Sequence, residues 1–114
     1  MLSSSSEVIL IVDDTPINLD VISNVLVDEG FEVAIATSGE MLFKQLKWYL
    51  PDLILLDVKM SVMDGFEICQ CLKRTDEYKD IPIIFMTSLA DIDSKSKGFQ
   101  LGAVDYITKP FQEL

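Results

Sequence analysis

Residues 53–65 read LILLDVKMSVMDG, and this stretch sets a pattern that the rest of the chain repeats. Four apolar residues lead to one carboxylate, Asp57, and a short loop then reaches Asp64 and Gly65. An unbroken apolar run of this length is typical of a strand that is covered on both faces. Aspartate is also a common turn residue. Asp57 therefore either only ends a strand or reacts at the strand's end.

Other short apolar runs have the character of strands, and helical patterns lie between them. The further strands are expected at residues 8–12, 31–36, 81–86 and 105–108, and the helices at 16–29, from 37 onward, after 65 and at 91–101. Strands that alternate with helices predict a parallel sheet with helices on both sides. The predicted fold class is therefore α/β, in one domain of five parallel strands.

Capping signals predict where the helices begin and end. Pro16 suits the first turn of the first helix, and Gly30 suits its end. Thr37 and Glu40 are three residues apart and predict a capping box for the second helix. The residues expected to face inward are Ile17, Val21, Ile22, Val25 and Leu26 in the first helix, Leu42, Phe43, Leu46 and Leu50 in the second, and Phe66, Ile68, Cys69 and Leu72 in the third.

Composition excludes several classes of protein. Nineteen acidic against nine basic residues give a net charge of -10, which repels phosphate backbones and anionic lipid. We therefore expect no direct binding of nucleic acid and no membrane association. The chain contains no histidine, which rules out histidine zinc sites, Ser-His-Asp triads and an internal phosphohistidine.

The two cysteines favour a reducing compartment. Cys69 and Cys71 lie two positions apart in a predicted helix, where their side chains point to different sides. They are poorly placed to form a disulfide. Because no apolar run reaches 18 residues and no signal peptide is evident, we expect a cytoplasmic protein.

Polar residues gather where the predicted strands end. In open parallel α/β sheets, ligands bind at the carboxyl ends of the strands, where the strand order reverses. If the first and third strands are neighbours, their carboxylates come close together, and a hard cation such as Mg²⁺, with Mn²⁺ as an alternative, would neutralise them. A fixed ammonium and a hydroxyl would serve the oxygens of a phosphate. The polar residues concerned are Asp13 and Asp14, Asp57, Thr87 and Ser88, and Thr108 and Lys109.

The alternative to such a site is three independent strand-end caps, since aspartate favours these positions in any case. Lys109 on its own would be read as an ordinary surface lysine.

Four motifs, taken together and in order, resemble the receiver domain of bacterial two-component response regulators. They are IVDD at 11–14, LLDVKMSVMDG at 55–65, MTS at 86–88 and YITKPF at 106–111. The resemblance implies a flavodoxin-like three-layer sandwich with strand order 2-1-3-4-5. Residues 1–6 would be a flexible tail and residues 7–114 the receiver domain. The fifth helix would be largely absent, and an uncovered apolar sheet face would favour a homodimer.

The resemblance also implies roles for individual residues. Two positions depart from the family pattern: Ser61 stands where proline is usual, which is expected to change the rigidity of the loop, and Ser88 stands where alanine is usual, which is expected to narrow or hydrate the phosphate's approach. The implied roles are phosphoacceptor for Asp57, acid pocket for Asp13 and Asp14, Mg²⁺ ligands for Asp14, Asp57 and the backbone carbonyl of Lys59, phosphoryl contacts for Thr87 and Lys109, and an aromatic switch for Tyr106.

The implied function is a phosphorylation switch. A sensor histidine kinase or histidine phosphotransfer protein would donate the phosphoryl group, and a downstream effector or output domain would respond. The chain would catalyse only its own phosphorylation and dephosphorylation, so it is not expected to be an enzyme acting on other substrates. The first helix, with Asn18, Ser23 and Asn24 exposed, would face the donor.

Two other functions compete with this one. A pseudo-receiver that is never phosphorylated would use the same fold as an interaction module. A phosphohydrolase with an aspartyl nucleophile would usually carry an Asp-x-Asp motif, which Asp57-Val58-Lys59 does not supply.

Overall fold

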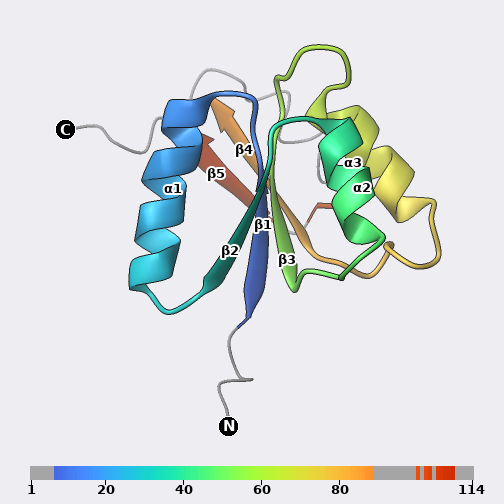
Figure 1. The fold of residues 1–114 in the computed structure, drawn as a ribbon. Coiled ribbons are helices and arrows are strands. Elements are labelled where there is room, and N and C mark those ends of the chain that lie inside the picture. The colour runs from blue at the N-terminus through green and yellow to red at the C-terminus, as the bar shows by residue number, and fades with distance from the viewer. Residues whose placement is uncertain (1–6, 89–99, 101, 104, 110–114) are drawn as a thin grey trace, which may run out of the picture.

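The structure, a computed structural model, describes residues 7–88, 100, 102–103 and 105–109. Five strands in these segments form one parallel sheet in the order β2-β1-β3-β4-β5, which confirms the predicted topology (Figure 1). The strands are β1 (Val8–Val12), β2 (Glu32–Ala36), β3 (Leu53–Asp57), β4 (Ile83–Ser88) and β5 (Asp105–Lys109), and the helices are α1 (Pro16–Asp28), α2 (Gly39–Leu46) and α3 (Gly65–Lys73).

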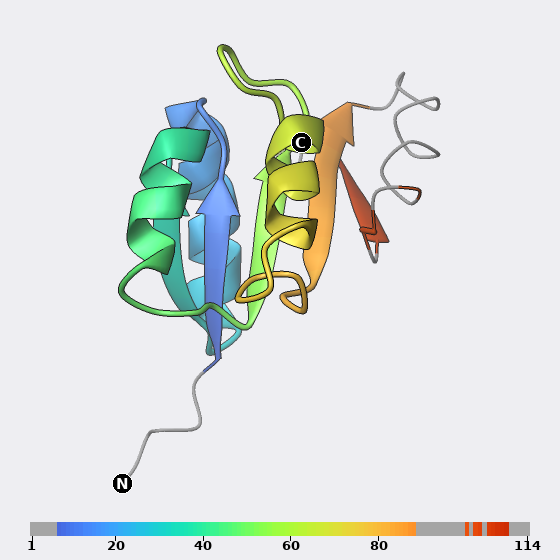
Figure 2. The ribbon, with the colours of Figure 1, turned by 90° about the vertical axis from the view of Figure 1, so that its right-hand side faces the viewer.

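Helices cover both faces of the sheet. The helix α1 lies on one face, and α2 and α3 lie side by side on the other (Figures 1 and 2). Successive residues of a strand point to opposite faces. In β1, Leu10 and Val12 pack with the core under α2 and α3, whereas Ile9 and Ile11 pack with the core under α1. The strands are therefore apolar at every position because both of their faces are buried.

The buried face of α1 differs from the predicted one. Leu19 and Ile22 are its buried residues, whereas Ile17 and Val25 are 68% and 56% exposed. The expectation that Ile17 and Val25 face inward was wrong. Apolar residues occur on several sides of this helix, so their spacing does not single out one face. The helix end was predicted correctly, because Gly30 follows it with a φ of 97°.

The start of α2 also differs from the prediction. The capping residue is Ser38, whose hydroxyl accepts a hydrogen bond from the Met41 N–H at 3.1 Å. Thr37 lies outside the helix, so the predicted capping box with Glu40 was wrong. Either hydroxyl could cap a helix from its own position, and sequence spacing alone does not choose between adjacent candidates. Leu50 lies beyond the end of α2 and is 56% exposed rather than buried.

The strand β4 lies two residues later than predicted. Ile81 belongs to the preceding turn, where its N–H bonds to the Tyr78 carbonyl, and Pro82 has no N–H to contribute to a strand. The strand instead continues through Thr87 and Ser88. Three expectations lie outside the described residues: the tail over 1–6, most of the helix over 91–101 and the near absence of a fifth helix after 110.

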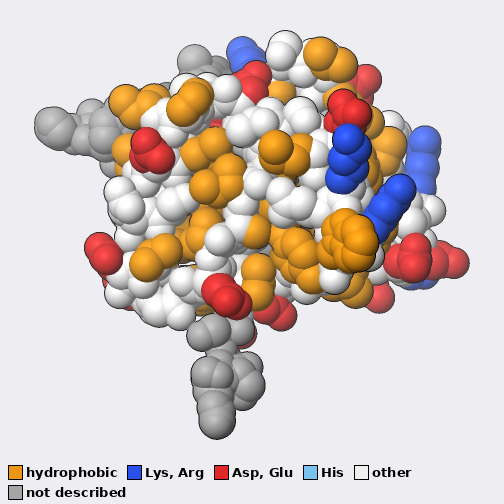
Figure 3. Space-filling model, in the orientation of Figure 1, with side chains coloured by type: hydrophobic (Ala, Val, Ile, Leu, Met, Phe, Trp, Pro, Cys, Tyr) orange, Lys and Arg blue, Asp and Glu red, His pale blue; other side chains and the backbone are white. Residues whose placement is uncertain are grey.

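Both acidic and hydrophobic side chains are visible on the surface. On the side shown in Figure 3, the acidic groups are scattered rather than gathered, and hydrophobic groups lie over α1 and beside the end of α2. Among the exposed large hydrophobic residues are Val27 of α1 and Trp48, which follows α2. No helix in the described part of the chain is long and apolar enough to span a bilayer.

The two cysteines have different environments on α3, and this generates a prediction. Cys69 is fully buried and burial raises the pKa of its thiol, partly opposed by the positive charge of Lys73, whereas Cys71 is exposed. At about pH 8, where an ordinary thiol is partly ionised, we expect a thiol-labelling reagent to modify Cys71 in the folded protein and Cys69 only after denaturation.

The matched control is Cys71→Ser, which leaves Cys69 as the single thiol. It should be silent when folded and should react once in denaturant, as counted by mass spectrometry. Rapid labelling of folded Cys71→Ser would contradict the buried position of Cys69.

Candidate functional site

Three carboxylates meet at the carboxyl edge of the sheet. Val12 pairs with Leu56 in neighbouring strands, so Asp13, which follows β1, comes next to Asp57, which ends β3. One oxygen from each of Asp13, Asp14 and Asp57 lies within 4.8 Å of the others. This is the point where the chain order reverses around β1, the place where open parallel sheets bind ligands.

Asp57 is held rigidly. Asp57 is 2% exposed. The next residue, Val58, continues the sheet because its N–H donates to the Met86 carbonyl at 3.1 Å. The first residue of α3, Gly65, donates its N–H to the Val58 carbonyl at 2.8 Å. A Cβ atom at position 65 would overlap the carbonyl oxygen of Asp57. The absence of a side chain at Gly65 therefore lets α3 begin directly against the strand end that carries Asp57.

Asp13 is fully buried and is bound by donors at the start of α1. Its Oδ1 accepts the Thr15 N–H at 2.9 Å, and its Oδ2 accepts the Asn18 side-chain N–H at 3.2 Å. Thr15, the capping residue of α1, makes no side-chain capping bond of its own. Asp13 thus stabilises the turn into α1 and also belongs to the acid cluster. The alternative of a strand-end cap therefore describes one of its two roles.

Two of the three residues expected to form an exposed donor-facing surface on α1 have other environments. The Asn18 side chain bonds to Asp13, and the Ser23 hydroxyl is buried and has no hydrogen-bond partner among the described residues. Asn24 is exposed as expected. The expectation was wrong for Asn18 because its side chain binds the neighbouring Asp13 instead of facing water, and wrong for Ser23 because its hydroxyl is buried.

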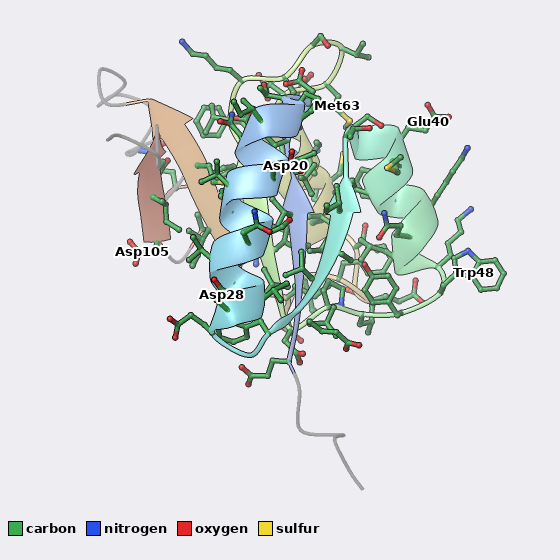
Figure 4. The ribbon with its side chains drawn as sticks, turned by 60° about the vertical axis from the view of Figure 1, so that its left-hand side comes forward. Asp20, Asp28, Glu40, Trp48, Met63 and Asp105 are labelled. Atoms are coloured by element: carbon green, nitrogen blue, oxygen red, sulfur yellow. The ribbon has the colours of Figure 1, made fainter. Side chains whose placement is uncertain are left out.

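Asp14 is the exposed member of the cluster. Its Oδ2 accepts the backbone N–H of Ser61 at 3.3 Å, which links it to the loop between β3 and α3. In that loop the Met63 N–H bonds to the Ser61 carbonyl at 2.8 Å, across Val62 with a φ of 69°. Figure 4 shows Met63 at the end of the molecule where β2 ends and α2 begins, and Asp28 at the opposite end of the molecule.

Asp64, the second carboxylate of the loop, has a structural role. It caps α3 in a capping box with Glu67, in which each side chain accepts the other residue's backbone N–H at 2.9 Å. Asp64 is therefore a residue that starts the helix. Its carboxylate is thereby distinguished from that of Asp57.

The remaining site residues lie on β4, β5 and the loop. Thr87 follows Met86, the partner of Asp57 in the sheet, and Lys109 pairs with Ser88, so both backbones reach the carboxyl edge. Tyr106 lies on β5, opposite Phe85 of β4, and the centroids of the two rings are 5.6 Å apart. Lys59 is exposed, two residues after Asp57.

The donor set fits a hard divalent cation. Carboxylate oxygens are the ligands that Mg²⁺ prefers, and the ion keeps several of its waters when it binds. The exposed Asp14 has more capacity left for a cation than Asp13, both of whose oxygens already accept N–H groups. Three negative groups this close also repel one another, and a cation relieves that repulsion.

Sequence reasoning missed three contributors to this geometry. Asn18 holds Asp13, Gly65 admits α3, and the Ser61 N–H binds Asp14. Gly65 carried a usable signal, because a glycine directly after a capping aspartate often marks close approach of backbone. The other two contacts join residues from different elements, and their spacing in the sequence does not reveal them.

Comparison with known proteins identifies relatives over nearly the whole chain. The model of the response regulator receiver domain family matches residues 9–114. The DNA-binding dual master transcriptional regulator RpaA of Synechocystis is 43% identical over 90% of this chain and 43% of its own length. The chain spans less than half the length of the first curated relatives that it matches.

Solved structures agree with this match. Chemotaxis protein CheY4 of Vibrio cholerae has a TM-score of 0.87 at 31% identity, covering 95% of this chain and 90% of that one. The receiver domain of sensor histidine kinase PA1611 of Pseudomonas aeruginosa has a TM-score of 0.83 at 29% identity, covering 95% and 88%. That structure holds a magnesium ion coordinated in its active site cleft.

The contact at Gly65 generates a prediction with a matched control. Gly39 and Gly65 are both the first residue of a capped helix. The atoms nearest to a Cβ at Gly39 would be side-chain atoms of Ile68 and Met63, at 3.1 Å and 3.2 Å, whereas those nearest to a Cβ at Gly65 would be backbone atoms. We expect Gly65→Ala to lower the free energy of unfolding by about 1–3 kcal/mol or more, and Gly39→Ala to change it much less.

Urea unfolding followed by far-ultraviolet circular dichroism measures both variants. Equal effects of the two substitutions would show that the approach of α3 to Asp57 is not a tight one.

Proposed function

The chain belongs to the family of response regulator receiver domains, and on this premise we propose that Asp57 is its phosphoacceptor. The supporting observation is the placement of Asp57, which is 2% exposed at a strand end with oxygens of Asp13 and Asp14 within 4.8 Å. A carboxylate on a rigid strand is well suited to in-line attack, since phosphoryl transfer depends chiefly on positioning and electrostatic stabilisation.

In the proposed reaction the donor is a phosphohistidine of a sensor histidine kinase or phosphotransfer protein. An oxygen of Asp57 attacks the phosphorus, the bond from phosphorus to the donor's ring nitrogen breaks, and that nitrogen keeps the electron pair. The product is an acyl phosphate on Asp57. The absence of histidine from this chain is consistent with a donor on another polypeptide or another domain.

Mg²⁺ is the proposed cofactor, with Mn²⁺ as an alternative, held by Asp14, Asp57 and the backbone carbonyl of Lys59. When bound, the ion would neutralise charge on the transferring group. Asp13, through its bonds to Thr15 and Asn18, would keep the acid pocket in place.

Thr87 and Lys109 are proposed to contact the phosphoryl oxygens once the group has transferred. Thr87 lies one residue before the end of β4 and Lys109 ends the neighbouring β5, at the edge that carries Asp57. A hydroxyl and an ammonium there would bind a group carrying about -1.5 to -2 charges.

Tyr106 is the proposed switch. Its ring packs beside Phe85 in the neighbouring strand and is partly buried, so an inward turn would change the surface around β4 and β5. A downstream effector or output domain that prefers the changed surface would shift the population. Complete switching needs about 5.5 kcal/mol of differential binding.

Phosphorylation can be tested with small-molecule donors. We expect the protein to gain the mass of one phosphoryl group when incubated with Mg²⁺ and acetyl phosphate or phosphoramidate, measured by intact-protein mass spectrometry. Asp57→Asn should abolish the gain, and removal of divalent cations with a chelator should suppress it.

The control is Asp64→Asn, since asparagine caps a helix about as well as aspartate and this carboxylate lies outside the cluster. It should retain the mass gain. If the wild-type protein gains no mass, a domain that only binds partners and is never phosphorylated becomes the better description.

A further inference from the structure

The loop between β3 and α3 contains a backbone donor that acts on the acid cluster. The Ser61 N–H bonds to Asp14 Oδ2 at 3.3 Å and joins residues 47 positions apart. Within the described residues, this is the hydrogen bond that the Asp14 carboxylate receives. Asp13, by contrast, is bound by two donors of its own neighbourhood.

The position of Asp14 depends on such a tether. Its side chain is exposed, while its neighbours Asp13 and Asp57 are buried and carry the same charge. Mutual repulsion favours rotation of the exposed carboxylate into water, away from the other two. A backbone N–H that bonds to a carboxylate opposes this rotation, because it stabilises the charged group where it stands.

The donor itself is well anchored. The Ser61 carbonyl accepts the Met63 N–H at 2.8 Å, and the Gly65 N–H closes the base of the loop on Val58 at 2.8 Å. Val58 directly follows Asp57 in the chain, so the tether ties Asp14 to the segment that carries Asp57. Lys59, whose carbonyl is a proposed ligand, lies in the same segment.

The bond requires a residue with a backbone N–H at position 61. Proline has none, whereas serine and alanine both have one. The serine hydroxyl takes no part in the contact, because the donor atom is the backbone nitrogen. Substitution at position 61 can therefore separate the contribution of the backbone N–H from that of the serine hydroxyl.

We propose that the Ser61 N–H is a positioning group that holds the Asp14 carboxylate toward Asp57 in the metal-free protein and thereby raises its affinity for a divalent cation. This inference rests on the proposed function, because it concerns the cation site of that function. The cation then binds a carboxylate that is already positioned, so less side-chain entropy is lost on binding.

The first test is the Mg²⁺ dissociation constant, measured by isothermal titration calorimetry without any phosphoryl donor. Ser61→Pro removes the N–H and should raise the dissociation constant about three- to tenfold, as expected for the loss of one hydrogen bond. Ser61→Ala keeps the N–H and should leave it unchanged. Equal affinity of Ser61→Pro and the wild type would overturn the inference.

The second test separates the tether from the stiffness that proline gives a loop. In the metal-free protein, the effect of Ser61→Pro on the unfolding equilibrium constant is compared in the wild-type and Asp14→Ala backgrounds by urea denaturation. If the tether acts through Asp14, the penalty should be about three- to tenfold larger when Asp14 is present. Equal penalties in both backgrounds would overturn the inference, because proline would then act on the loop alone.

The two proposals fail in different ways. If the wild-type protein binds no divalent cation, the metal site of the proposed function fails, and the claim about affinity fails with it. If the wild type binds Mg²⁺ but Ser61→Pro binds it equally well, the metal site stands and only the role of Ser61 is lost.

Discussion

The register between β1 and β3 is the constraint on which the site depends. Val12 lies opposite Leu56, so the first residue after one strand and the last residue of the other come together. A slip of one residue would move every side chain of a strand to the other face. It would turn Leu10 and Val12 away from the core under α2 and α3 and would also separate the carboxylates. The buried apolar faces therefore fix the acid cluster, because the same register serves both.

Clustered carboxylates cost free energy, and the chain offsets that cost unequally among the three. Asp13 is buried but receives two N–H groups, which replace the water that it loses. Asp57 is buried on the strand that packs against the start of α3. Asp14 stays in contact with water and is tethered at 3.3 Å by one backbone group. The cluster thus combines two buried members with one exposed member.

The sequence predicts the sheet well and the details of the helices less well. The parallel sheet follows from unbroken apolar runs that alternate with helical patterns. The strand order, and with it the meeting of Asp13, Asp14 and Asp57, is implied by the resemblance of four motifs to the receiver family, because the runs alone do not say which strands are neighbours. The choice of Ser38 over Thr37 as a cap depends on local backbone angles, and the inward face of α1 depends on the sheet beneath it. The bonds of Asn18 to Asp13 and of Ser61 to Asp14 join different elements, which only the folded chain brings together.

The difference between the two buried carboxylates and the exposed Asp14 affects how the site binds a ligand. A group that is fixed by packing is already positioned and loses little entropy when a ligand binds. Within the described residues, the Ser61 N–H is the group that joins Asp14 to the loop between β3 and α3. The loop is closed at its base by the Gly65 bond to Val58 and leads directly into α3. A ligand that binds Asp14 therefore meets a residue that is tied to the segment between Asp57 and α3, while the β1–β3 pairing positions Asp13 and Asp57.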